Sequence, residues 1–105
     1  MRRTISVALP HDLGEEEAKR RLAKGFSDAR TKYPAYLQHA REAWNGNTME
    51  FTASAIGQTV SGRVQVEAKR LLIHIDLPLL LAVFAEHILP HVESEGRRLL
   101  SGPPQ

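Results

Sequence analysis

Nine consecutive residues, Leu77 to Ala85, carry no polar side chain, and this run limits what the chain can fold into. A surface helix of a globular protein has one apolar stripe, so a helix that is apolar all round must bury a second face. Nine residues are too few to span a bilayer, which takes about 20. We expect the run to form the first half of the last helix. Its second face then needs a core, a second chain, a ligand or an apolar particle to cover it.

The length and composition of the chain are those of one ordinary globular domain. A chain of 105 residues buries roughly 65% of its unfolded surface, which is enough for one core. We expect one domain over residues 1–105, with an ordered core from about 4 to 100 and a short tail at 101–105. The chain has no cysteine, so disulfide bonds and thiolate chemistry are excluded.

We expect no targeting signal in the N-terminal residues. They lack the apolar core and the small-residue cleavage site of a signal peptide, and no long apolar run follows Arg2-Arg3. The net charge of +2 gives only a weak field towards polyanions. We expect a cytoplasmic protein that does not span a membrane.

Alternation of apolar and polar residues predicts a sheet, because every second side chain of a strand points to the same face. The segment from Ala35 to Ala43 is weakly patterned but is assigned to a strand, and Asn45-Gly46-Asn47 after it is a strong hairpin signal. In either register of that hairpin, Trp44 shares a face with the apolar row of the next strand. The predicted inward rows are Ile5, Val7 and Leu9; Met49, Phe51 and Ala53; Val60, Gly62, Val64 and Val66; and Leu71, Ile73 and Ile75.

The first helix is predicted to run from Gly14 to a stop at Tyr33-Pro34. Gly14 can serve as the N-cap, and Glu17 follows in the capping-box position. Spacings of three and four residues place an apolar stripe on the buried face of this helix. The members of the stripe are Ala18, Leu22, Phe26 and Ala29.

The last helix is predicted to follow directly on the last strand. Asp76 suits its N-cap, and Pro78 is tolerated in its first turn. Pro90 should kink the helix because its ring clashes with the carbonyl of Glu86. On the helical wheel the sheet-facing side carries Leu77, Leu81, Phe84, Ile88, Val92 and Leu99, whereas Leu79, Leu80 and Val83 fall elsewhere.

The order strand, helix, four strands, helix predicts an α+β fold. Hairpin-connected strands favour an antiparallel sheet with its helices on one face. We therefore expect a curved five-stranded antiparallel sheet with two helices on one face. The order resembles the TATA-binding-protein-like and helix-grip-like architectures, an analogy that carries no function.

Candidate chemistry in this chain rests on histidines. His87 and His91 are four residues apart and would share a helix face, but zinc needs three or four ligands. Two histidines at a core boundary are the favoured reading, because Pro90 distorts the turn between them. His74 should lie on the open sheet face beside Arg63, where it could act as a general base, but no serine or acid is tied to it by spacing. We expect no catalytic residue, no cofactor and no metal.

Nucleic-acid binding is not predicted. The open sheet face should carry few cations and no aromatic side chain that could stack on a base or wedge between base pairs. Three glutamates precede the basic cluster Lys19-Arg20-Arg21-Lys24, so this cluster supports its own helix. The side chains expected on the open face are Thr4, Ser6, Glu50, Thr52, Ser61, Arg63, Gln65, Leu72 and His74.

Four segments spread over roughly residues 4–100 carry a family resemblance. They are Ile5-Ser6-Val7 through His11-Asp12-Leu13-Gly14 and Glu17-Ala18-Lys19-Arg20-Arg21; Trp44-Asn45-Gly46-Asn47-Thr48-Met49-Glu50-Phe51; Gly62-Arg63-Val64-Gln65-Val66; and Asp76-Leu77-Pro78 with Leu80-Leu81 and Phe84. Together these segments resemble the polyhydroxyalkanoic acid system family, small bacterial proteins associated with polyester-granule gene regions. The resemblance implies a non-enzymatic accessory role, through association with the granule or with granule-coating proteins.

The apolar run carries the functional hypothesis. Its partner or interface residues would be Leu79, Leu80 and Val83, used for a homodimer, a polyester granule or a granule-coating protein. A well-buried helix start is the plainer alternative. A second hypothesis is a module that binds a small apolar ligand between the sheet and its helices. The side chains expected to line that space are Trp44, Phe51, Phe84 and Ile88. An enzyme comes third, because cysteine is missing and His74 lacks a partner.

Overall fold

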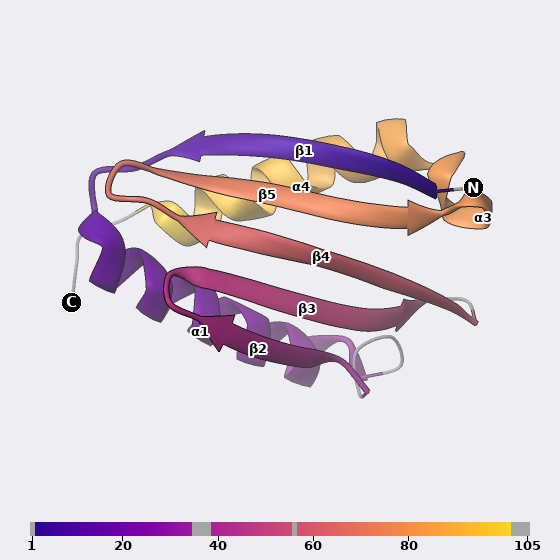
Figure 1. The fold of residues 1–105 in the computed structure, drawn as a ribbon, viewed down its shortest axis with the longest axis horizontal. Coiled ribbons are helices and arrows are strands. Elements are labelled where there is room, and N and C mark those ends of the chain that lie inside the picture. Colours follow the sequence, from indigo (N-terminus) through magenta and orange to yellow (C-terminus); the bar gives the residue numbers. More distant parts are fainter. Residues whose placement is uncertain (1, 35–38, 56, 102–105) are drawn as a thin grey trace.

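One antiparallel sheet with its helices on a single face makes up the protein (Figure 1). A computed structural model describes residues 2–34, 39–55 and 57–101. Its elements are β1 (Arg2–Pro10), α1 (Gly14–Lys32), β2 (Arg41–Asn45), β3 (Thr48–Ala55), β4 (Gln58–Val66), β5 (Arg70–Pro78), α3 (Leu79–Ala82) and α4 (Ala85–Leu100).

The strands lie in the order β1-β5-β4-β3-β2, and every neighbouring pair is antiparallel. β2 to β5 follow one another as hairpins, whereas β1 closes the sheet by pairing with β5 from Arg2–Pro78 to Pro10–Arg70. The predicted α+β class with a five-stranded antiparallel sheet is therefore confirmed. The two long helices lie behind the sheet in Figure 1, α4 behind β1 and β5 and α1 behind the strands on the other side.

The hairpin signal places its loop at Gly46 and Asn47. Gly46 has φ of +61°, a left-handed conformation that glycine adopts without steric cost. Trp44 pairs with Met49, so the predicted sharing of a face is confirmed. The strand expected from position 35 is shorter than predicted, because residues 39 and 40 are described but β2 begins only at Arg41. Residues 35–38 lie outside the described residues.

The sheet face covered by the helices carries the core. Alternation is confirmed on every long strand, because the predicted inward rows supply most of the buried apolar side chains that the strands contribute. Leu9, Met49, Leu71 and Leu77 are the largest fully buried ones. The main core cluster joins three of these four to Ala18 of α1 and Leu100 of α4, so the sheet and both long helices share it.

The start of α1 differs from the prediction. Gly14 is the first helical residue, at φ of +78°, and the cap position falls on Leu13 without a side-chain cap hydrogen bond. Glu17 does not close a capping box, since its carboxylate binds arginines of the same helix. The side chain that orders this turn is His11, whose Nδ1 accepts the Leu13 backbone N–H at 3.1 Å.

His11 is a buried residue that the sequence pattern did not single out. It is 8% exposed, and its Nε2 lies 3.0 Å from the carbonyl oxygen of Glu67. Because Nδ1 accepts a hydrogen bond, Nε2 must carry the proton that it donates to Glu67. The backbone N–H of His11 also donates to the carbonyl oxygen of Lys69 at 2.8 Å. His11 therefore joins the β1–α1 turn to the β4–β5 turn.

The apolar run from Leu77 to Ala85 is not the first half of one helix, so that prediction is wrong. Leu77 and Pro78 end β5, four residues form α3, and α4 begins at Ala85 after a break at Val83 and Phe84. Asp76 lies inside β5 and caps no helix. α4 continues through Pro90 to Leu100, so the interruption falls before this helix and not at the proline.

Candidate functional site

Four large apolar side chains lie exposed at one end of the molecule, and we call this surface the apolar cap. Its residues are Leu79, Leu80, Val83 and Phe84, with 60%, 54%, 71% and 48% of their surface exposed. The structure therefore brings together the three residues predicted as a partner surface. Phe84 was assigned to the sheet-facing stripe, and that assignment is wrong.

The apolar cap is anchored from beneath by the other residues of the same run. Leu81, Ala82 and Ala85 are buried and pack in one cluster with Ile5 of β1 and Leu77 of β5. This cluster is the second of the two core clusters and lies under α3. The apolar side chains of the run thus lie on two sides of α3. Those on the inner side are buried against the sheet, and those on the outer side remain exposed to solvent.

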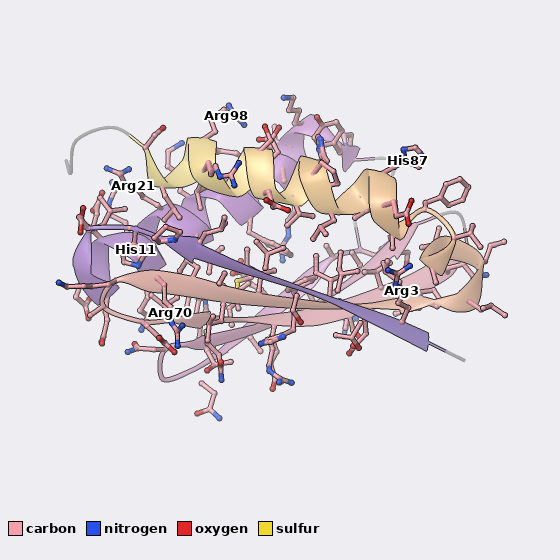
Figure 2. The ribbon with its side chains drawn as sticks, turned by 90° about the horizontal axis from the view of Figure 1, so that it is seen from above. Arg3, His11, Arg21, Arg70, His87 and Arg98 are labelled. Carbon is pink, nitrogen blue, oxygen red and sulfur yellow. The ribbon has the colours of Figure 1, made fainter. Side chains whose placement is uncertain are left out.

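Polar side chains border the apolar cap. Figure 2 shows Arg3 of β1 and His87 of α4 at the same end of the molecule as α3. Both residues are exposed, as is Glu86 at the start of α4. Exposed apolar patches with a polar rim are typical of surfaces that meet a protein, a ligand or a membrane-like phase.

A second feature is a groove between α1 and α4, which we call the interhelix groove. The two helices meet where α1 begins and α4 ends, and they diverge towards the other end of α1 (Figure 1). The groove has a volume of about 670 Å³. Its apolar lining comes from Leu22, Ala29, Leu71, Ile73, Val92 and Leu99.

Arg21 closes the narrow end of the interhelix groove. Its Nη1 donates to the carbonyl oxygens of Leu99 and Ser101 at 3.4 and 2.6 Å, and its Nε donates to Glu17 at 2.8 Å. Only 9% of Arg21 is exposed, and its bond to Glu17 confirms the prediction that the preceding glutamates and this basic cluster support the helix. The four-residue spacing from Glu17 was the one signal in the sequence that could have indicated a paired side chain.

Glu17 supports this contact with an unusually acidic carboxyl group. Hydrogen bonds from Arg20 and then from Arg21 lower the pKa of Glu17 from 4.5 to about 2. A carboxyl group whose pKa is lower in the folded than in the unfolded chain stabilises the fold above its unfolded pKa. That stabilisation is lost as the pH falls from 4.5 towards about 2.

We therefore expect Glu17→Gln to lower the free energy of unfolding at neutral pH and to lose this effect as the pH approaches about 2. Urea denaturation of both proteins across this range measures the difference. Glu16→Gln is the matched control, since Glu16 is exposed in the same turn of α1. A gap between wild type and Glu17→Gln that stayed constant with pH would contradict the assignment.

The predicted ligand space is not the one that the structure contains. None of Trp44, Phe51, Phe84 and Ile88 lines the interhelix groove. Trp44 lies under Lys19 of α1, whose Nζ is 5.2 Å from the ring centroid. Phe51 packs against Phe26 with the ring centroids 6.2 Å apart. These aromatic side chains therefore fill the space between sheet and helix themselves.

The open face of the sheet, away from the helices, forms a third candidate surface. A hollow of about 650 Å³ lies there, bordered by polar side chains of all five strands. His74 lies on this face opposite Arg63, as predicted. A hydrogen bond of 2.9 Å joins its Nδ1 to Ser6 Oγ, so the structure supplies a serine partner that the sequence did not indicate.

Among the described residues, no carboxylate is hydrogen-bonded to the His74 ring of the Ser6–His74 pair. In the described residues the nearest carboxylate of the same two strands, Asp76, accepts a hydrogen bond from Thr4 Oγ1. Hydrolytic serines need a base that is held in one orientation by a further group.

Residues 2–34, 39–55 and 57–101 were expected to contain neither a metal site nor a membrane span. No group of three or more histidine, aspartate or glutamate side chains there is arranged to hold a metal ion. His87 and His91 are both exposed on α4. No helix in this part of the chain is long and apolar enough to cross a membrane.

Comparison with known proteins identifies the family. No curated protein and no solved structure matches the chain, so the likeness to TATA-binding-protein-like and helix-grip-like architectures stays a prediction. The family model described as "Putative polyhydroxyalkanoic acid system protein" matches residues 5–100, which is almost the whole chain and agrees with the resemblance noted in its sequence. The chain thus belongs to the polyhydroxyalkanoic acid system protein family.

Proposed function

We propose that this protein is a non-enzymatic accessory component of polyhydroxyalkanoate storage that attaches to the polyester granule through the apolar cap. The single observation that carries the proposal is the exposure of the four cap residues, each at 48% or more. Membership of the polyhydroxyalkanoic acid system family supports the polyester as the apolar phase. The polar rim would remain in water while the cap meets the granule surface.

The size of the apolar cap suggests a reversible attachment. Burying a fully exposed leucine, valine or phenylalanine side chain contributes about 1.5–3 kcal/mol. Four such side chains that are already half-buried in the chain contribute about 5 kcal/mol together. Loss of translational and rotational freedom offsets much of this gain. We therefore expect an exchanging surface protein and not one that is permanently anchored.

The cap could instead meet a granule-coating protein or a second copy of this chain. A homodimer would bury two caps against each other, and it would compete with granule attachment for the same residues. This alternative has a distinct mass in solution, so light scattering coupled to size exclusion separates the two readings.

The double substitution Leu80→Glu with Val83→Glu should reduce binding to isolated polyester granules about tenfold or more, since two charges would have to leave water. Co-sedimentation of the protein with granules measures the bound fraction. Ser27→Glu with Ser94→Glu is the matched control, because it adds two charges at exposed helix positions away from the cap. Both variants should unfold at the wild-type urea concentration, because the substituted side chains are exposed.

Three outcomes would contradict the proposal. Granule binding that survives in the folded Leu80→Glu, Val83→Glu variant would show that the cap is not the contact. A wild-type dimer that becomes a folded monomer in this variant would make the cap a subunit interface. Turnover of ester or thioester substrates by the purified protein would contradict the non-enzymatic part of the proposal.

A further inference from the structure

The interhelix groove is an apolar space that the described residues leave open. Leu71 and Ile73 of β5 lie beneath it and are already covered by the protein's own atoms, at 1% and 8% exposure. Its partly exposed apolar side chains come from both helices, Leu22 and Ala29 on α1 and Val92 and Leu99 on α4. Its volume of about 670 Å³ falls within the roughly 300–1,000 Å³ of small-molecule sites.

The rim of the groove is cationic. The described lining contains five lysine and arginine side chains, namely Arg20, Arg21, Lys24, Lys32 and Arg98, against the two carboxylates of Asp28 and Glu95. An excess of positive side chains around an apolar cleft focuses the field and attracts an anionic group to its mouth.

Lys32 is the cation at the rim that is positioned for an added anion, with His91 on the opposite helix. Arg20 binds Glu17, Lys24 binds Asp28, and Arg98 binds Glu95. Lys32 at the end of α1 and His91 in α4 have no such ion pair within the described part of the chain. The Nζ atom of Lys32 lies 5.4 Å from the Tyr33 ring centroid. This contact leaves the ammonium group able to donate hydrogen bonds to an anion.

The electrostatics of Glu95 show that these groups act on one region. The pKa of Glu95 is lowered first by its hydrogen bond from Arg98 and further by the charges of Arg98, His91 and Lys32. Lys32 comes from α1 and the other two groups from α4, so positive potential reaches the same place from both walls of the groove.

We propose that the interhelix groove binds an anionic amphiphile, a free carboxylic acid with an unbranched alkyl chain. The alkyl chain lies between the helices against the partly exposed side chains of Leu22, Val92 and Leu99, and the carboxylate lies at the mouth beside Lys32 and His91. This site is separate from the apolar cap, which lies beyond the start of α4, and the inference does not rest on the granule proposal.

Calorimetric titration of the full chain with three probes of equal chain length tests this site. Decanoate, decanol and decyltrimethylammonium share the alkyl chain and differ in the charge of the head group. Decanoate should bind about tenfold more tightly than decanol, because a charge-assisted hydrogen bond replaces a neutral one. Decyltrimethylammonium should bind least. Undetectable decanoate binding below its self-association concentration, or equal affinity for all three probes, would overturn the proposal.

Two variants locate the site. Lys32→Glu should weaken decanoate about tenfold and leave decanol unchanged, because only the charged head group is affected. Ala29→Trp should abolish binding of both probes by filling the groove. Arg41→Glu makes the same change of charge on the open face of the sheet and should leave all affinities unchanged. A folded Ala29→Trp protein with wild-type decanoate affinity would place the binding elsewhere and overturn the assignment.

Discussion

Replacing Gly62 with alanine should lower the free energy of unfolding by about 3 kcal/mol. Gly62 lies in β4, opposite Phe51 of β3 and Ile75 of β5. A Cβ at this position would lie under 3.0 Å from the His74 backbone carbonyl oxygen and from Cζ of Phe51. The Phe51 ring can turn away, but the carbonyl belongs to the neighbouring strand and can move only with the sheet.

Urea denaturation with Ser61→Ala as the control measures this effect, since Ser61 adjoins Gly62 on β4 and its substitution adds no atoms. The double variant Gly62→Ala with Phe51→Leu separates the two clashes. Because the backbone clash remains, the smaller Phe51 replacement should not restore stability to Gly62→Ala. A loss below about 1 kcal/mol in Gly62→Ala would mean that the strands separate there at little cost.

The contact between Leu9 and Gly96 should produce a strongly non-additive pair of substitutions. Leu9 is 2% exposed, and a Cβ on Gly96 would lie under 3.0 Å from its Cδ1. Leu9→Ala should cost about 3 kcal/mol through lost burial and the remaining cavity. Gly96→Ala should cost about 1–3 kcal/mol by pushing α4 away from β1, although alanine is the better helix former.

The double variant Leu9→Ala with Gly96→Ala tests this contact. With Leu9 truncated, the added methyl group has room, and the helix propensity of alanine then favours the substitution by up to about 1 kcal/mol. The double variant should therefore be no less stable than Leu9→Ala alone in thermal and urea unfolding. Additive losses would show that the two residues do not share the space.

Local patterns predicted most of the sheet because they depend on neighbouring residues. Period-two alternation identified the inward rows, and Asn45-Gly46-Asn47 identified the hairpin between β2 and β3. The stripe of α1 was found in the same way, with Ala18 fully buried at 0% exposure. Each of these signals lies within one element, so no knowledge of the three-dimensional arrangement was needed.

The end of β5 could not be predicted, because a distant strand determines it. An uninterrupted apolar run fits a buried helix and a buried strand equally well. Pairing of Arg2 with Pro78 extends β5 to the proline, and only then does the chain turn into α3. The break at Val83 and Phe84 then shifts the helical phase, so Phe84 faces solvent although a continuous wheel placed it inward.

The candidate site was predicted only in the part that depends on neighbouring residues. Leu79, Leu80 and Val83 could be predicted because they lie in a run of residues that contains no polar side chain. The Ser6–His74 bond and the contact of Arg21 with Leu99 link residues 68 and 78 positions apart. Strand register and helix crossing bring these groups together, and neither leaves a mark in the local sequence.

The strand order also determines when each strand can pair during translation. β1 is the earliest of the five strands to leave the ribosome, yet its sheet partner is β5, which is complete only at Pro78. β3, β4 and β5 each meet a partner after a short turn, whereas β1 must close a long loop, which slows pairing. For most of its synthesis the nascent chain therefore carries an unpaired apolar strand, with Ile5 and Leu9 exposed until the last hairpin has been made.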